Sequence, residues 1–210
     1  MPPLSGRLFR AAAALTCLAS VLSAQATSTR EVVWNSYEPP DSSFAVLFPQ
    51  RGHVSITSND AGSDKITSYV VNPANGTTTL LVKVWENEAF AKRDPSRVLD
   101  QNRLDIGLTR VSNTDSTLHL GPYAGRWGHT EGDAGKPPRH QVIVYRAFVA
   151  GARMYVVSAS SLPGQKLSAD ADKFIESFTI CEAAGPCTAP RAPMEGPSSR
   201  EKSRSSTRGP

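Results

Sequence analysis

Hydrophobic and polar positions alternate over several short stretches between residues 30 and 187, and this pattern predicts a chain rich in strands. The run FAVLFP at residues 44–49 is apolar at every position and ends in proline. Such a run is typical of a short strand that is covered on both faces. Residues 66–72 and 79–85 flank the turn-forming run PANG, whose Asn-Gly pair tolerates positive φ. We therefore expect these two segments to form a hairpin.

Two further strand pairs are predicted in the second half of the chain. Residues 117–120 and 126–130 flank the turn-forming run GPYAG, which indicates a second hairpin. Residues 131–140 are polar and rich in Gly and Pro, so they predict a loop. The runs at 141–149 and 153–160 are apolar at most positions, as is typical of central strands with little polar face.

A helix is predicted in the middle of the chain. Asp94 followed by Pro95 is a helix start, because the carboxylate can accept a hydrogen bond from an orphan backbone N–H and proline loses no bond in the first turn. Gly107 can end this helix. Its predicted apolar side consists of Val98, Leu99 and Ile106.

A second helix is predicted near the end of the domain. Ser168 is its expected cap, and Asp170 and Asp172 follow in the first turns, where the helix dipole favours anions. Apolar residues occupy positions i, i+3, i+4 and i+7, namely Ala171, Phe174, Ile175 and Phe178. We expect this stripe to pack on a sheet.

Antiparallel hairpins with a middle helix and a closing helix predict an α+β fold. The expected form is an α/β/α sandwich, with a mainly antiparallel sheet and both helices packed on it. A length of 210 residues has room for one domain with extra segments at its ends. With 39% hydrophobic and 20% charged residues, the composition excludes a fibrous or wholly disordered protein.

Several short motifs resemble the PsbP/DcrB-like families of exported α/β/α sandwich proteins. The motifs are FAVLFP at 44–49, the hairpin at 66–85, LGPYAGRWGH at 120–129, the strand pair at 141–160 and DKFIESFTI at 172–180. Together they cover roughly residues 43 to 180. The resemblance implies a non-enzymatic domain, over residues 30–187, that binds or assembles with other envelope components. It implies no catalytic residue and no cofactor.

The two ends of the chain differ from its middle. An apolar stretch at residues 11–22 follows two arginines and precedes the small-residue pattern AQA. This order is typical of a signal peptide over residues 1–26, cleaved after Ala24 or Ala26. No apolar run is long enough for a transmembrane segment in the mature chain. Residues 188–210 are rich in Pro, Ser, Gly and Arg, and they predict a disordered basic tail.

The distribution of charge argues against a nucleic-acid-binding domain. The formal net charge is +4, but residues 27–187 contain 16 basic and 17 acidic side chains, so the predicted domain is not basic. We therefore expect no specific nucleic acid partner. The predicted signal peptide indicates a periplasmic or extracellular location. An alternative role belongs to the basic tail, which could tether the protein to polyanions such as anionic lipids at a membrane surface.

Two cysteines are left after removal of the predicted signal peptide. Cys181 and Cys187 form an even pair in a chain expected in an oxidising compartment, and this predicts a disulfide. The alternative, a redox-active pair, normally has the tighter C-x-x-C spacing.

A single cluster offers metal-binding chemistry. It combines the imidazoles and carboxylates that Zn²⁺ accepts, in His129, Glu131, Asp133 and His140. This cluster is the basis of a second functional hypothesis, a metal-dependent enzyme. The alternative interpretation of the same residues is a hydrated loop with ordinary polar side chains. The chain has neither a G-x-S-x-G elbow nor a glycine-rich phosphate loop of the common kinds, so no serine hydrolase and no nucleotide cofactor is predicted.

Tyr123, Arg126 and Trp127 are the predicted contact with a partner, because Tyr, Arg and Trp are the residue types enriched in interface hot spots. The alternative is that Trp127 packs beneath the last helix. The first functional hypothesis is therefore an exported, non-catalytic domain that acts through contacts with an envelope protein.

Overall fold

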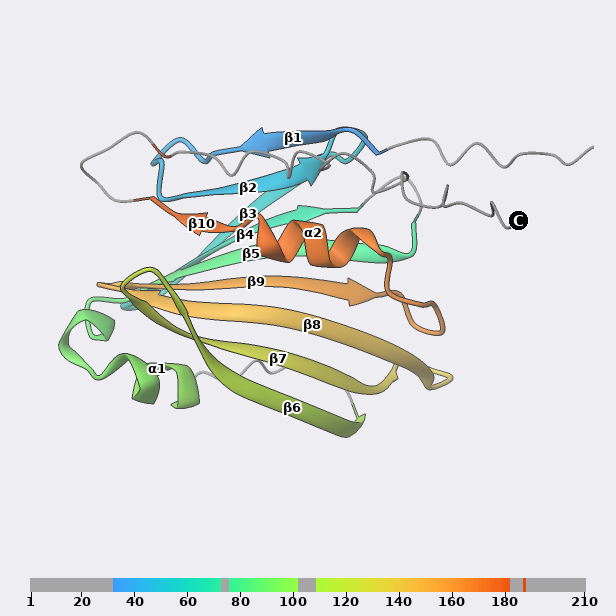
Figure 1. The fold of residues 1–210 in the computed structure, drawn as a ribbon. Coiled ribbons are helices and arrows are strands. Elements are labelled where there is room, and N and C mark those ends of the chain that lie inside the picture. The colour runs from blue at the N-terminus through green and yellow to red at the C-terminus, as the bar shows by residue number, and fades with distance from the viewer. Residues whose placement is uncertain (1–31, 73–75, 102–108, 182–186, 188–210) are drawn as a thin grey trace, which may run out of the picture. The chain divides into compact units, whose positions relative to one another are not determined.

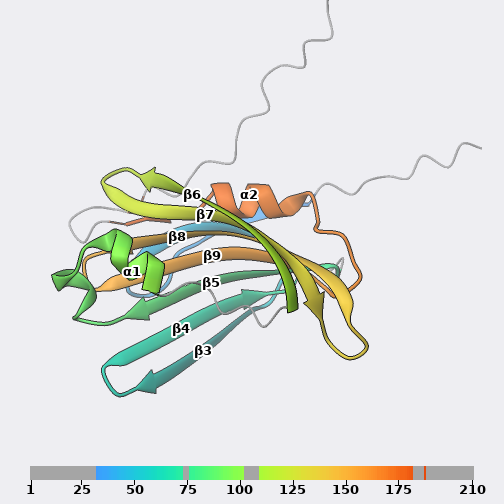
Figure 2. The same ribbon diagram turned by 90° about the horizontal axis from the view of Figure 1, so that it is seen from below.

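Strands dominate the computed structural model, which describes residues 32–72, 76–101, 109–181 and 187 (Figure 1). Seven of the described strands form one sheet, and they are β3 (Val54–Ala61), β4 (Asp64–Val71), β5 (Thr78–Glu86), β6 (Thr109–Leu120), β7 (Tyr123–Ala134), β8 (Arg139–Ala150) and β9 (Arg153–Ser161). Their order is β3-β4-β5-β9-β8-β7-β6, and every pair is antiparallel. Strands β3 and β6 are therefore the two edges of the sheet (Figure 2).

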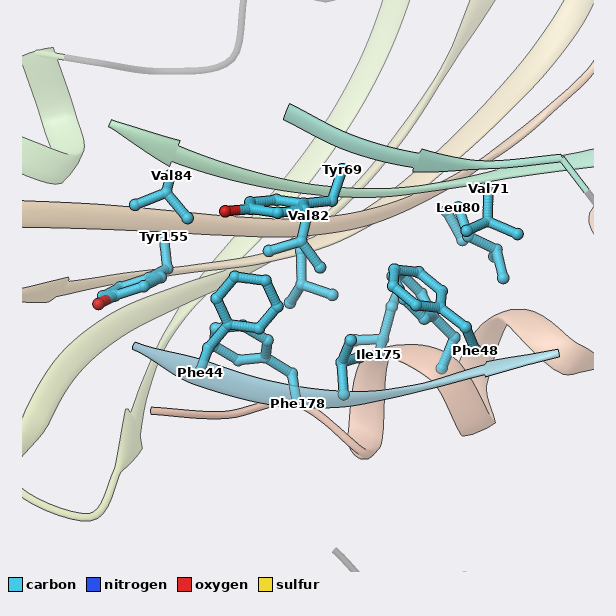
Figure 3. Packing of buried hydrophobic residues seen from close by; sticks show 14 of the residues in the cluster. Phe44, Phe48, Tyr69, Val71, Leu80, Val82, Val84, Tyr155, Ile175 and Phe178 are labelled. Carbon is cyan, nitrogen blue, oxygen red and sulfur yellow. The ribbon is translucent and has the colours of Figure 1, made fainter. Parts of the chain in front are cut away.

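A smaller antiparallel sheet and one helix cover a face of the large sheet. The smaller sheet contains β1 (Trp34–Tyr37), β2 (Phe44–Pro49) and β10 (Thr179–Ile180), in the order β1-β2-β10. Helix α2 (Asp170–Glu176) lies beside β2 on this face (Figure 3). All six residues of β2 are buried, which confirms the prediction of a strand covered on both faces.

The principal hydrophobic core lies between these two layers. Because side chains alternate along a strand, every second residue of β5 and β9 points into this core. Figure 3 shows the rings of Phe44, Phe48 and Phe178 facing the large sheet. The buried members of this core are Phe44, Val46, Phe48, Tyr69, Val71, Leu80, Val82, Val84, Phe148, Tyr155, Val157, Ala159, Ala171, Phe174, Ile175 and Phe178. The predicted apolar stripe of the closing helix is therefore confirmed.

A second core lies on the opposite face of the large sheet, under the short helix α1 (Pro95–Gln101) and the 3₁₀ turn η1 (Phe90–Lys92). The carboxylate of Asp94 accepts hydrogen bonds from the backbone N–H groups of Ser96 and Arg97, as its position before Pro95 predicts. The side chains that pack here include Phe90, Val98, Leu99, Tyr145, Val149, Met154 and Val156. The predicted end of this helix, with Ile106 and Gly107, lies outside the described residues.

The prediction of an α/β/α sandwich is wrong. Each of the two α-helices in the described residues is seven residues long, so neither forms a layer across the large sheet. Strands instead occupy segments in which the sequence shows little strand signal, above all β3, whose residues are almost all exposed. The fold is a β-rich arrangement of two antiparallel sheets.

Strands β7 and β8 extend beyond their predicted ends, into segments predicted as a turn and a loop. The predicted loop at 131–140 is mostly strand, because β7 continues to Ala134 and β8 begins at Arg139. In β7, Gly125 and Gly128 lie opposite Phe148 and Tyr145, and a Cβ at either glycine would overlap those rings. Glycine is therefore needed here for close packing against aromatic side chains of the neighbouring strand.

A disulfide joins Cys181 to Cys187, as the sequence predicts. The backbone N–H of Cys181 donates to the carbonyl oxygen of Ser43, so the disulfide lies next to the start of β2. In the part of the chain that the structure describes, no helix is both long and apolar enough to cross a membrane. The predicted signal peptide (1–26) and basic tail (188–210) lie outside the described residues.

Candidate functional site

A polar pocket of about 280 Å³ opens where the β1–β2 connection passes over one end of the large sheet. Neighbouring strands place its charged residues in a row, because Lys65 of β4 is in register with Glu86 of β5, and Glu86 is in register with Arg153 of β9. The β1–β2 connection adds Asp41 and Ser43 at the side of this row. Three strands, β4, β5 and β9, and one connection thus form the pocket.

Ion pairs join all four charged side chains of the pocket. The Arg153 Nε–H donates to Glu86 Oε1 at 2.8 Å, and Arg153 Nη2 lies 3.2 Å from Asp41 Oδ2. Lys65 Nζ lies 3.3 Å from Glu86 Oε2. Asp41 Oδ1 also accepts a hydrogen bond from the Ser43 hydroxyl at 2.9 Å. Two cations and two carboxylates therefore balance, and the pocket carries no formal net charge.

Tyr69 supplies a hydroxyl group to this pocket. Its side chain is one of the core residues, with 8% of the residue exposed, and Figure 3 shows its hydroxyl and that of Tyr155 pointing in the same direction, with the Tyr69 hydroxyl directed toward Val84. Burial, followed by the negative charge of Asp41, raises the pKa of Tyr69 to about 12. The Tyr69 hydroxyl is therefore protonated at neutral pH and can donate a hydrogen bond.

Two neighbouring side chains complete the electrostatics of the site. Burial is the largest influence on the pKa of Tyr155 and raises it, and its hydroxyl donates to the Ser43 carbonyl oxygen at 3.4 Å. Burial lowers the pKa of Arg153, but a hydrogen bond with Tyr155 and the carboxylates of Glu86 and Asp41 outweigh this effect and raise it overall. The guanidinium is therefore a permanent cation with fixed carboxylate partners.

The predicted metal cluster lies elsewhere, at the far end of β7 and the start of β8. His129 Nε2 lies 3.2 Å from Glu131 Oε1, and His140 Nε2 lies 3.8 Å from Glu131 Oε2. Asp133 is in register with His140 on the neighbouring strand. Within the described ranges, no group of three or more His, Cys, Asp or Glu side chains is arranged to hold a metal ion. Ion pairs therefore join three of the four predicted residues, with Glu131 between His129 and His140.

The three predicted contact residues do not share a surface. They follow one another in β7, whose side chains alternate between the two faces of the sheet, so Tyr123 and Trp127 point to one face and Arg126 to the other. Arg126 pairs with Asp100 of α1 and, at 3.6 Å, with Asp115 of β6. Trp127 is 38% exposed and lies in register with Arg146 of β8, so Arg146 is the arginine on its face.

Sequence reasoning missed the polar pocket. Its charged residues are spread over more than 100 positions of the chain, and each is an ordinary polar residue near the end of a strand or turn. Only the pairing of β5 with β9, which skips three intervening strands, places Glu86 beside Arg153. The available signal was the presence of charged residues at the ends of otherwise apolar runs.

Comparisons with known proteins identify no family for this chain. No protein-family model matches it, and neither does any curated protein. A crystal structure of a protein from Bacteroides thetaiotaomicron is similar with a TM-score of 0.44 and 12% identity over 70% of this chain, which spans 48% of the length of that protein. A protein of unknown function from Pseudomonas aeruginosa, PA94, gives a TM-score of 0.33 and 9% identity, over 62% of this chain and 83% of that protein. Because both TM-scores are low, we draw no conclusion from them, and the resemblance to the PsbP/DcrB-like families stays a prediction.

Proposed function

We propose that this protein is an exported, non-catalytic domain that binds another protein of the cell envelope. The contact region that we propose, called the Trp127 surface below, consists of Tyr123, Trp127 and Arg146. The resemblance to the PsbP/DcrB-like families, which implies binding or assembly, supports this proposal. The pattern of an export signal at residues 1–26 supports an envelope location.

The observation that carries the proposal is an exposed indole beside a half-buried guanidinium on one strand pair. Trp127 has 38% of its surface exposed, although large aromatic side chains are usually buried in a monomer. Arg146 lies beside it in register, and its nearest acidic neighbour is Glu176 of α2 at 4.0 Å, on a side chain that is itself 68% exposed. Tryptophan and arginine are the residue types that most often dominate the energy of protein interfaces.

This surface determines the chemistry of the partner. The partner must present an apolar side chain to Trp127 and a carboxylate to Arg146, because a buried guanidinium without a partner is costly. The ion pair with Glu176 is loose, so a carboxylate of the partner can replace or join it.

The proposal is tested by site-specific photocrosslinking in the native host. A photoreactive amino acid at position 127 is expected to form a defined adduct with one envelope protein, whereas the same amino acid at the exposed Ser58 of β3 gives no such adduct. Arg146→Glu is expected to lower the yield of the adduct about tenfold, since reversal of an interface charge costs more than 1 kcal/mol. Arg51→Glu reverses an exposed charge outside the Trp127 surface and is the matched control. Identical products from positions 127 and 58, or an adduct indifferent to Arg146→Glu, would contradict the proposal.

A further inference from the structure

We propose that the pocket lined by Asp41, Lys65, Tyr69, Glu86 and Arg153 binds a small, uncharged polyhydroxyl ligand of the size of one sugar ring. The pocket shares no residue with the Trp127 surface, so this inference does not depend on the proposed protein contact. Three observations carry it: the balance of charge, an unused hydroxyl donor and the volume of the pocket.

The balance of charge favours an uncharged ligand. An added anion would lie near the carboxylates of both Asp41 and Glu86, and an added cation would lie near both Lys65 and Arg153. Either one would also compete with the ion pairs that these four side chains already form with one another. A ligand hydroxyl needs no such exchange, because it can accept from a cation and donate to a carboxylate at the same time.

The Tyr69 hydroxyl is the group that such a ligand would satisfy. The ring of this residue belongs to the core, and its hydroxyl points toward Val84, which lines the pocket together with Tyr69 (Figure 3). No side chain or backbone group in the described residues forms a hydrogen bond with this hydroxyl, whereas the Tyr155 hydroxyl already donates to Ser43. Because Tyr69 lines the pocket, this hydroxyl is free to donate a hydrogen bond to an oxygen atom of a ligand there.

The volume and lining of the pocket set the size of the ligand. Sites for drug-sized molecules usually span roughly 300–1,000 Å³, and the present pocket of about 280 Å³ lies just below that range. Pro40 and Val84 add apolar surface to a lining that is otherwise polar. A single sugar ring combines hydroxyl groups with apolar C–H faces and so matches both kinds of surface.

The test is an NMR titration of the full chain, followed through the backbone amide signals of Ser43, Lys65, Tyr69 and Arg153. The probes are glucose, galactose and N-acetylglucosamine, with glycine as a zwitterion and acetate as an anion of small size. At least one sugar is expected to shift these four signals with a Kd on the order of 1 mM, and glycine and acetate are expected to leave them unchanged.

Variants connect the binding to the hydroxyl donor. Tyr69→Phe removes only the hydroxyl and is expected to weaken sugar binding about tenfold. Tyr123→Phe makes the same change on β7, outside the pocket, and is expected to leave the affinity unchanged. Arg146→Glu is also expected to bind the sugar normally, so a failure of the protein-contact proposal does not affect this result.

The outcomes decide the inference and identify the source of the ligand. If no sugar of the panel shifts the four signals, if glycine or acetate binds more tightly than every sugar, or if Tyr69→Phe binds as well as the natural chain, the inference is wrong. If a sugar does bind, an oligosaccharide that ends in this sugar is titrated in the same way. Tighter binding of the oligosaccharide points to the end of an envelope glycan, and binding of the free sugar alone points to a soluble ligand.

Discussion

At Tyr69, burial and a neighbouring carboxylate act on the same hydroxyl group. In the sequence, this residue is one aromatic position within the strand-forming run ITSYVVN, and nothing in that run indicates an altered acidity. The fold covers the ring with Phe44, whose centroid lies 5.2 Å away, and brings Asp41 close to the hydroxyl. The chemical character of Tyr69 therefore comes from residues on β2 and on the connection before it.

Tyr69 is expected to make the fold sensitive to alkaline pH. Its pKa is about 12 in the folded protein and 10.0 for an ordinary tyrosine, so the unfolded chain loses this proton first. The stabilisation is complete below pH of about 10 and is lost as the pH rises to about 12. Urea unfolding across this range should show a smaller loss of stability for Tyr69→Phe than for the natural chain.

Tyr123→Phe is the control for this measurement, and it should lose stability as steeply as the natural chain, because Tyr123 lies on β7, outside the polar pocket. Tyr37 and Tyr155, whose pKa values burial also raises, are present in both variants. Curves of equal steepness for Tyr69→Phe and the natural chain would show that Tyr69 does not cause the loss of stability at alkaline pH.

At the scale of elements, a buried serine links the small sheet to helix α2. The Ser177 hydroxyl accepts a hydrogen bond from the backbone N–H of Leu47 at 2.9 Å and donates to the carbonyl oxygen of Phe174 at 2.7 Å. Ser177 follows the last residue of α2, and Leu47 lies in the fully buried strand β2. One side chain thus satisfies a backbone donor of β2 and a backbone acceptor of the helix, about 130 positions apart in the chain.

Ser177→Ala is expected to destabilise the protein by about 1–3 kcal/mol, because it leaves the N–H of Leu47 buried without a partner. Ser58→Ala is the matched control, since the Ser58 hydroxyl contacts Thr67 on an exposed surface and its loss should change stability by less than about 0.5 kcal/mol. The free energies of unfolding in urea give both values. Equal values for the two variants would show that the β2–α2 link contributes nothing.

The elements themselves could be predicted to different degrees. The first turn of α1 and the apolar stripe of α2 follow from local patterns, and both are confirmed. The strand β7 was predicted only over residues 126–130, because Gly125 was interpreted as part of a turn and residues 131–140 as a loop, although Phe148 occupies the space beside Gly125. The sequence around a glycine does not show which side chain of another strand lies against it.

At the scale of the whole molecule, the disulfide anchors the last described strand. Cys181 follows β10, and its backbone N–H donates to Ser43, so this end of the domain is held against the start of β2. The same residue, Ser43, contributes to the polar pocket. The strand order of the smaller sheet thus brings β10, the last strand in the described residues, next to β2.

Replacement of both cysteines by serine is expected to lower the free energy of unfolding by roughly 2 kcal/mol, because the closed loop is short and constrains the unfolded chain only slightly. The far-ultraviolet circular dichroism spectrum should stay that of a strand-rich protein, since both cores are unchanged. Urea unfolding of the natural chain with and without a reducing agent should reproduce the same difference. Complete unfolding of the variant would contradict this expectation.

The sequence by itself determined the local features of this protein: strand-forming runs, the hairpin of β4 and β5, two helix starts, the apolar stripe of α2 and the cysteine pair. These features depend on spacing between residues that are neighbours in the chain. Only the tertiary structure decided the class of the fold, the face on which Arg126 lies and the existence of the polar pocket. These depend on which distant strands pair and in what register, and a shift of one residue would turn each side chain to the other face of its sheet.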